Sequence, residues 1–197
     1  MCNFVSMISN ELKSATHVSH QQLEKTVVLR LKSIRSEADY AVFLTYFYAY
    51  FHAVEQAIAD FITPEVLPDY AERRNSDYLK QDIESLGGTV EALPTAIAPF
   101  IDSTAAALGA LYVLEGSIMG GPYIVQMLQK HGIAKGFSFF SGYGADTGKM
   151  WLAFTETLDA CATDAGQREA VLQTAQETFE RFGDVFARDS VAMDAIS

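Results

Sequence analysis

Of the four histidines in this sequence, His20 has the surroundings best suited to a metal ligand. His20 is followed four residues later by Glu24, so a helix over this stretch would place both side chains on one face. A carboxylate in that position can accept the Nδ1 proton of the imidazole and leave Nε2 free to bind a metal ion. Exposed histidines that form only a surface ion pair show the same spacing, so the pair alone leaves both interpretations open.

The other histidines do not complete a familiar metal site. His17 and His20 form an HxxH pair, but no third or fourth ligand is spaced for zinc, and HExxH is absent. No glutamate precedes a histidine by three residues, which argues against a carboxylate-bridged di-iron bundle. His52 lies among aromatic residues and is expected in the core, and His131 lies at a predicted helix end. The histidine spacing therefore supports neither a zinc site nor a di-iron site.

A cluster of glycines is the second unusual feature. Gly116, Gly120 and Gly121 fall on one face of a predicted helix, and Pro122 follows directly. Each glycine inside a helix costs about 1 kcal/mol relative to alanine, so some other interaction must offset these choices. Close packing of another helix would do so, and so would a flat ligand lying against backbone that carries no Cβ atoms. The sequence pattern leaves these two explanations open.

Composition narrows the class of protein. The chain has 197 residues, 49% of them apolar, and a net charge of −11, so a folded domain is expected and nucleic acid is not an expected partner. The first 35 residues nevertheless carry five basic and two acidic side chains, which suggests a local basic surface. Neither Cys2 nor Cys161 has metal-type or redox-type spacing, and no secretory signal is apparent, so a cytoplasmic location is expected. No phosphate-loop, dinucleotide or serine-hydrolase motif is present.

One segment has the length of a membrane span. Residues 105–127 carry a single charged residue, Glu115. A carboxylate in mid-span is costly, Gly121-Pro122 interrupts the run, and no basic cluster flanks it. The segment is therefore expected to be the buried helix of a soluble core, and no membrane partner is expected.

The pattern of apolar residues predicts an all-α, single-domain multi-helix bundle over residues 1–197, with an ordered core of about 8–190. Ser9 or Asn10, Ser36 and Ser103 are candidate N-caps, and Gly87 and Gly132 are candidate helix stops. Residues 136–147 are expected to form an irregular loop. The predicted helices cover about 10–26, 37–61, 76–86, 104–131, 148–161 and 166–188.

Four segments in this order resemble the heme oxygenase family. Residues 15–24, Ala-Thr-His-Val-Ser-His-Gln-Gln-Leu-Glu, are similar to its proximal helix. Residues 112–121 resemble its distal helix, in the bacterial form that contains Leu-Glu-Gly-Ser followed two residues later by Gly-Gly. Residues 73–87 and 136–158 are similar to the connecting helix and to the later loop and helix. The closest likeness is to the bacterial enzymes associated with bacteriophytochromes.

The resemblance implies roles for individual residues. His20 would be the axial ligand of the heme iron, oriented by Glu24. Animal-type enzymes carry an Arg and an Asp where this chain has Val113 and Ser117, so Ser117 and ordered water would have to supply protons. The residues expected to bind heme are Lys13, His20, Glu24, Tyr112, Gly116, Gly120 and Gly121, and those expected to act in catalysis are Gly116, Ser117 and Gly120.

The resemblance also implies a reaction. Heme would be both cofactor and substrate, dioxygen the co-substrate, and the products biliverdin, carbon monoxide and ferrous iron. Electrons would come from an external donor, such as a ferredoxin or a reductase, and the product could enter a bacteriophytochrome pathway. Two alternatives remain: a non-catalytic heme-binding protein of the same fold, and a helical protein of another class, such as a thiaminase-like enzyme or an interaction module.

Overall fold

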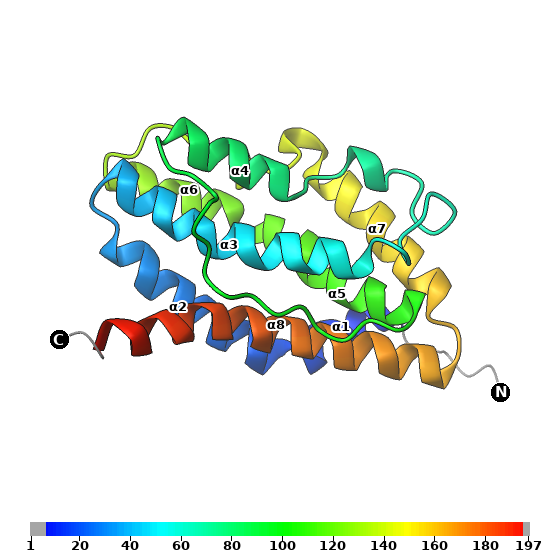
Figure 1. The fold of residues 1–197 in the computed structure, drawn as a ribbon. Coiled ribbons are helices and arrows are strands. Elements are labelled where there is room, and N and C mark those ends of the chain that lie inside the picture. Colours follow the sequence, from blue (N-terminus) through cyan, green and yellow to red (C-terminus); the bar gives the residue numbers. More distant parts are fainter. Residues whose placement is uncertain (1–6, 195–197) are drawn as a thin grey trace.

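The computed structural model describes residues 7–194, with side chains as far as residue 187. It contains no strand within that range, which confirms the all-α prediction. The elements, shown in Figure 1, are α1 (Ile8–Ala15), α2 (His17–Ser33), α3 (Glu37–Ile58), η1 (Tyr70–Glu72), α4 (Ser76–Ser85), α5 (Thr104–Gly116), η2 (Ser117–Gly120), α6 (Gly121–Lys130), η3 (Gly144–Asp146), α7 (Thr147–Cys161) and α8 (Ala165–Asp194).

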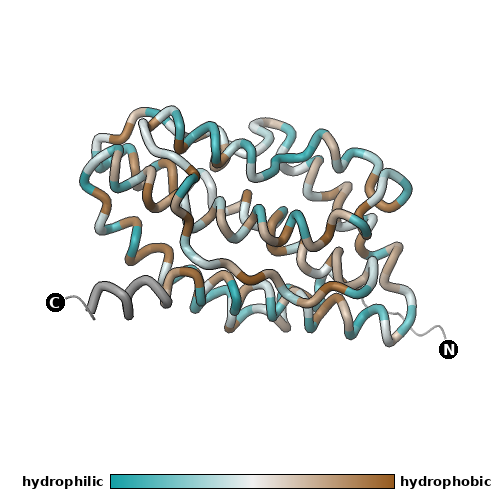
Figure 2. The backbone as a smooth tube through the Cα atoms, in the orientation of Figure 1, coloured by the Kyte–Doolittle hydropathy of each residue, from teal (hydrophilic) through white to brown (hydrophobic). Residues whose placement is uncertain are grey.

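The helices pack around α5, the most apolar of them. Helix α8 runs along α5, α1 and α2 pack against α8, and α4 lies on the outer side of α3 (Figure 1). A Cβ atom on Gly109 would lie 2.4 Å from the carbonyl oxygen of Val171, so this glycine lets α5 and α8 approach closely. Figure 2 shows that the outer helix α4 is largely hydrophilic.

The long apolar stretch Thr104–Lys130 is a core helix segment. It is long and apolar enough to cross a membrane, but 56% of its apolar window is buried inside the protein. Its single carboxylate, Glu115, is buried and forms a 2.6 Å ion pair with Arg73. This is the arrangement expected for the interior of a water-soluble helical fold.

The N-terminal helix differs from its prediction. We expected one helix from Ser9 or Asn10 to about residue 26, but α1 ends at Ala15 and α2 continues to Ser33. The buried Thr16 hydroxyl donates to the carbonyl of Leu12 at 2.7 Å, and such a bond competes with the helical pattern and bends helices. The cap prediction was also wrong, because Met7 is the N-cap and the Ser9 side chain donates to Asp159 instead.

Other boundaries agree more closely. The Ser36 and Ser103 side chains accept hydrogen bonds from the backbone N–H of Asp39 and Ala106, which confirms both as N-caps. Helix α3 ends at Ile58, three residues before the predicted end.

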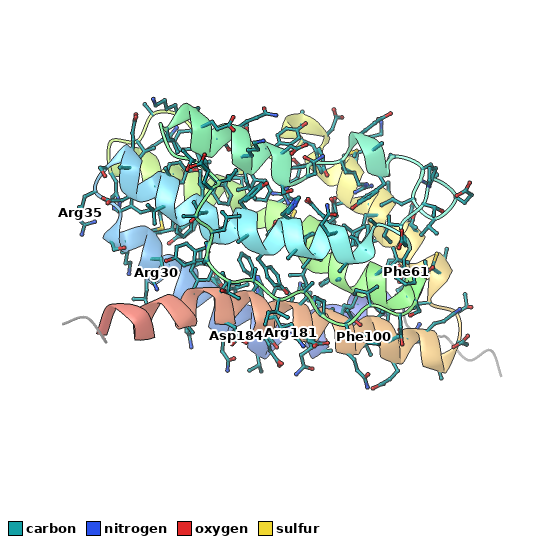
Figure 3. All side chains as sticks on the ribbon, in the orientation of Figure 1. Arg30, Arg35, Phe61, Phe100, Arg181 and Asp184 are labelled. Atoms are coloured by element: carbon teal, nitrogen blue, oxygen red, sulfur yellow. The ribbon has the colours of Figure 1, made fainter. Side chains whose placement is uncertain are left out.

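Residues 86–103 have no regular structure and cross α3 towards α8 (Figure 1). Figure 3 shows Phe100 projecting from this connection, and its side chain is 75% exposed.

The central helix is not continuous. We expected it to run from Ser103 past Gly120 to about His131, but α5 stops at Gly116 and a short 3-10 turn, η2, separates it from α6. Pro122 falls in the first turn of α6, where its missing N–H costs nothing. The predicted central helix is therefore two helices joined at the glycine cluster.

Candidate functional site

A cavity of about 620 Å³ lies between α2, the α5–α6 junction, α7 and α8. This volume falls within the range of about 300–1,000 Å³ typical of small-molecule sites. The walls are mainly apolar and aromatic, with a few polar groups. The lining side chains used below are Lys13, His17, His20, Glu24, Phe47, Tyr112, Ser117, Phe140, Trp151, Phe179 and Phe182, together with the backbone of Gly116 and Gly120.

His20 projects into this cavity from the first turns of α2. Its ring meets Phe179 of α8 edge-on, with the two ring centroids 5.3 Å apart. His17 lines the cavity one turn earlier, and Glu24 lines it one turn later. The structure therefore brings the predicted pair of His20 and Glu24 to one site, although no hydrogen bond joins them among the described contacts.

Two further predicted residues line the cavity, Lys13 from α1 and Tyr112 from α5. Lys13 is exposed at the edge of the cavity and supplies a positive charge there. Tyr112 reaches the same region from α5 and lies 5.6 Å, centroid to centroid, from the Trp151 ring. Burial raises the pKa of Tyr112. A tyrosine hydroxyl is protonated at neutral pH even without such a shift, so it can donate to an anion.

The three clustered glycines have different surroundings. Gly116 and Gly120 both line the cavity. A Cβ atom on Gly116 would make ordinary contact with Trp151 at 3.6 Å, and one on Gly120 would meet nothing within 4 Å. Packing within the protein therefore does not require glycine at either position.

The prediction that all three glycines face a ligand is wrong for Gly121. It does not line the cavity, and an added Cβ would lie 2.0 Å from the carbonyl oxygen of Phe140. Gly121 therefore permits close approach of the 137–143 loop to the start of α6. Close packing therefore explains Gly121, against a loop and not against a helix, whereas a ligand facing Gly116 and Gly120 stays a prediction.

Ser117 lines the cavity, but its hydroxyl is already engaged. It donates to the carbonyl of Leu114 at 2.7 Å and accepts from Arg74 Nη2 at 2.8 Å. Arg74 also donates to the Leu114 carbonyl at 2.7 Å. With its proton committed, the Ser117 oxygen is arranged to accept a hydrogen bond from water rather than to donate one.

A buried ionic network behind the cavity was not found from the sequence. Arg73 bonds to Asp69 and Glu115, and the Tyr143 hydroxyl lies 3.1 Å from both Glu115 carboxylate oxygens. Burial raises the pKa of Glu115, and the charges of Arg73 and Arg74 oppose that shift. The one signal in the sequence was the isolated charge of Glu115 within an apolar run.

Sequence reasoning also missed most of the aromatic wall. Phe47 of α3, Phe140 of the 137–143 loop, Trp151 of α7 and Phe179 and Phe182 of α8 all line the cavity. Phe179 and Phe182 are three residues apart on one helix face, but that spacing is equally typical of ordinary core residues. Only the packing of distant helices brings these rings together.

The remaining histidines lie elsewhere. His52 was expected in the core, but it is exposed, with its ring stacked on Tyr48 and its Nδ1 3.3 Å from Ser76 Oγ. His131 follows the last residue of α6 as its C-cap, as the sequence indicated. Neither lines the cavity described above.

The cavity fits an iron porphyrin. Within residues 7–194 no group of three or more His, Cys, Asp or Glu side chains could hold a metal ion. An iron porphyrin brings ring nitrogens of its own and needs few ligands from the protein. His20 can add one axial nitrogen. The aromatic walls suit the flat ring, the bare Gly116 and Gly120 backbone allows close approach, and Lys13 suits a propionate.

Known proteins are similar to this chain over most of its length. The sequence model of the heme oxygenase family matches residues 6–188. A heme oxygenase of Xanthomonas campestris pv. campestris is 31% identical over 138 residues, which cover 69% of this chain and 81% of that protein. Heme oxygenase PigA of Pseudomonas aeruginosa is 25% identical over 182 residues, or 91% of each chain.

Solved structures share the fold. The NO- and CO-bound heme oxygenase of Neisseria meningitidis has a TM-score of 0.79 at 23% identity, covering 92% of this chain and 91% of that one. Heme oxygenase-1 of the cyanobacterium Synechocystis, solved in complex with heme, has a TM-score of 0.73 at 17% identity, covering 97% and 96%. Since the family model spans nearly the whole sequence and the Xanthomonas relative exceeds 30% identity, the chain belongs to the heme oxygenase family.

Proposed function

We propose that this protein binds heme in the cavity described above, with His20 as the axial ligand, and cleaves the ring oxidatively to biliverdin with release of carbon monoxide and ferrous iron. The observation that carries the proposal is that His20 and the bare backbone of Gly116 and Gly120 line one aromatic cavity. When bound, heme supplies the redox centre that activates dioxygen and is itself the substrate.

The protein's own residues have separate tasks in this proposal. Glu24 lies one turn from His20 and would accept its Nδ1 proton, which directs Nε2 towards the iron. Lys13 and the Tyr112 hydroxyl would bind propionates and orient the ring in the cavity. Gly116 and Gly120 would keep space above it clear of side chains.

Ser117 would hold a water molecule rather than give up its own proton. Its hydroxyl donates to Leu114, so its free lone pair can accept from a water in the cavity. That water would deliver the proton that ring cleavage consumes. The water, and not the Ser117 hydroxyl, would therefore supply the proton for ring cleavage.

An external protein must supply the electrons. The family generally uses a redox partner, and we infer a ferredoxin or a reductase for this chain. The basic side chains of the first 35 residues lie on the segment that forms the cavity edge, so an acidic ferredoxin is the better electrostatic match. A cytoplasmic location and a bacteriophytochrome pathway for the product remain predictions.

Hemin titration followed by aerobic reduction tests the proposal. We expect a saturable one-to-one complex with a Soret band, and biliverdin absorption after a reductant and dioxygen are added. A Soret band that persists through reduction would indicate a non-catalytic heme-binding protein. Absence of a one-to-one complex would overturn the assignment and favour another class of helical protein.

A matched pair of variants tests the ligand. His17 and His20 line the same cavity one turn apart, so His17→Ala is the natural control for His20→Ala. We expect His20→Ala to lose the absorption spectrum of a histidine-ligated heme and His17→Ala to retain it. The reverse result would assign the axial position to His17.

A further inference from the structure

Arg74 is buried and forms no direct ion pair with a carboxylate among the described side chains, although the charge of Glu115 acts on it. Its guanidinium donates to the carbonyl of Phe139 at 3.3 Å, and its Cζ lies 3.9 Å above the ring of the same residue. Its Nε is buried without a hydrogen-bond partner. The neighbouring Arg73 is bonded to two carboxylates, those of Asp69 and Glu115. The sequence resemblance gave neither arginine a role.

The two other side-chain bonds of Arg74 end at the C-terminal end of α5, beside the cavity, and its backbone N–H donates to the Tyr143 hydroxyl at 3.0 Å. Its Nη2 donates to the Leu114 carbonyl at 2.7 Å and to Ser117 Oγ at 2.8 Å. Ser117 Oγ in turn donates to the same carbonyl. Arg74 does not line the cavity, so it would act on a bound ligand only through Ser117 and the backbone that follows it.

These bonds lie where the central helix breaks. In a continuous helix the Leu114 carbonyl would accept from the N–H four residues later. Here two side-chain donors bond to this carbonyl, and the 3-10 turn η2, whose bonds run to the third residue, begins at Ser117. Side-chain donors that compete for a helical carbonyl favour such a break, and Gly116 and Gly120 of this junction line the cavity.

We propose that Arg74 is the positioning residue of this wall: it holds η2 and the orientation of the Ser117 hydroxyl from outside the cavity. A guanidinium does not release its proton in a protein, so the role is to hold and not to relay. The consequence for heme rests on the proposed function, but the effect on η2 does not.

Arg74→Lys and Arg73→Lys form a matched pair, since each keeps the charge at a buried arginine. A lysine at 74 cannot make the forked set of bonds to Leu114, Ser117 and Phe139. We expect amide hydrogen exchange of residues 116–121 in the heme-free protein to accelerate about tenfold or more in Arg74→Lys and to stay near wild type in Arg73→Lys. Ser117→Ala, which leaves Arg74 intact, should give a smaller acceleration.

A second measurement tests whether the change at η2 reaches a ligand bound in the cavity. In the ferrous heme complex with carbon monoxide as probe, we expect the C–O stretching band to shift or split in Arg74→Lys, while the Soret maximum of the ferric complex stays in place because the His20 side is untouched. Equal exchange rates at 116–121 in the two lysine variants would overturn the proposal. Because exchange is measured without heme, failure to bind heme would count against the proposed function alone. If Arg74→Lys does not fold, the comparison of Ser117→Ala with wild type decides, and unchanged exchange at 116–121 refutes the role.

Discussion

Alanine substitutions at Gly120 and Gly121 should have opposite effects, although the two glycines are adjacent. A Cβ at position 121 would lie 2.0 Å from the Phe140 carbonyl oxygen and 3.0 Å from its carbon, so the two backbones would have to separate. Overpacking of this kind costs about 1–3 kcal/mol. Because both atoms belong to backbone, we expect the upper end, about 3 kcal/mol, which lowers the melting temperature of a protein of this size by about 6–12 °C.

Gly120→Ala meets no atom within 4 Å in the heme-free protein. Alanine is favoured over glycine in helical backbone by about 0.5–1 kcal/mol, so the melting temperature should stay the same or rise by about 1–4 °C. The new methyl group would enter the cavity, however. A steric cost of about 1–3 kcal/mol against a bound ring corresponds to a loss of roughly 5- to 150-fold in heme affinity.

The assay is a thermal melt of the heme-free proteins followed by a hemin titration of each. Gly121→Ala should melt early yet bind heme with nearly wild-type affinity at a temperature where it is folded. Gly120→Ala should melt normally and bind heme weakly. A Gly121→Ala protein as stable as wild type, or a Gly120→Ala protein with unchanged heme affinity, would refute the division of roles between the two glycines.

Three other predictions concern binding, packing and pH. Lys13→Ala should weaken heme binding by about 1.5- to 5-fold, since an exposed ion pair contributes about 0.2–1 kcal/mol, and the loss should shrink at high salt in titrations. Gly109→Ala should lower the melting temperature markedly in calorimetry, because its Cβ would lie 2.4 Å from the Val171 carbonyl oxygen; a melting temperature equal to that of wild type would contradict the close approach of α5 and α8. Glu55 of α3 accepts hydrogen bonds from the backbone N–H and the hydroxyl of Ser76. Burial raises the pKa of Glu55 above that of the unfolded chain, so its contribution to stability is present below the unfolded value and is lost as pH rises through the folded one. Melting temperatures between pH 4.5 and 8 should therefore fall less steeply in Glu55→Gln, and an equal slope would show that Glu55 is not the group responsible.

The sequence predicted those features that depend on neighbours in the chain. Ser36 and Ser103 cap helices because each side chain bonds to an N–H three residues away. His20 and Glu24 reach one cavity because they lie one turn apart on the same helix. Such local relations can be followed without knowing the rest of the fold.

Features that depend on distant partners could not be predicted. Gly121 faces the Phe140 backbone, and nothing in the sequence around position 121 distinguishes it from Gly120. Ser117, where α5 gives way to η2, bonds to Arg74, 43 residues earlier. The break at Thr16 is a different case, because a threonine inside a helix bonds back to the preceding turn only in some contexts.

The attachment of α1 affects when the heme site can be completed during synthesis. Asp159 of α7 accepts bonds from the backbone N–H and the hydroxyl of Ser9, 150 residues earlier, and Arg168 of α8 pairs with Glu11. At about 5–20 residues per second, a ribosome adds the partner of Ser9 roughly 8–30 s after Ser9 itself. Until α7 and α8 have been made, α1 lacks these contacts, and the cavity lacks the part of its wall that Trp151, Phe179 and Phe182 supply.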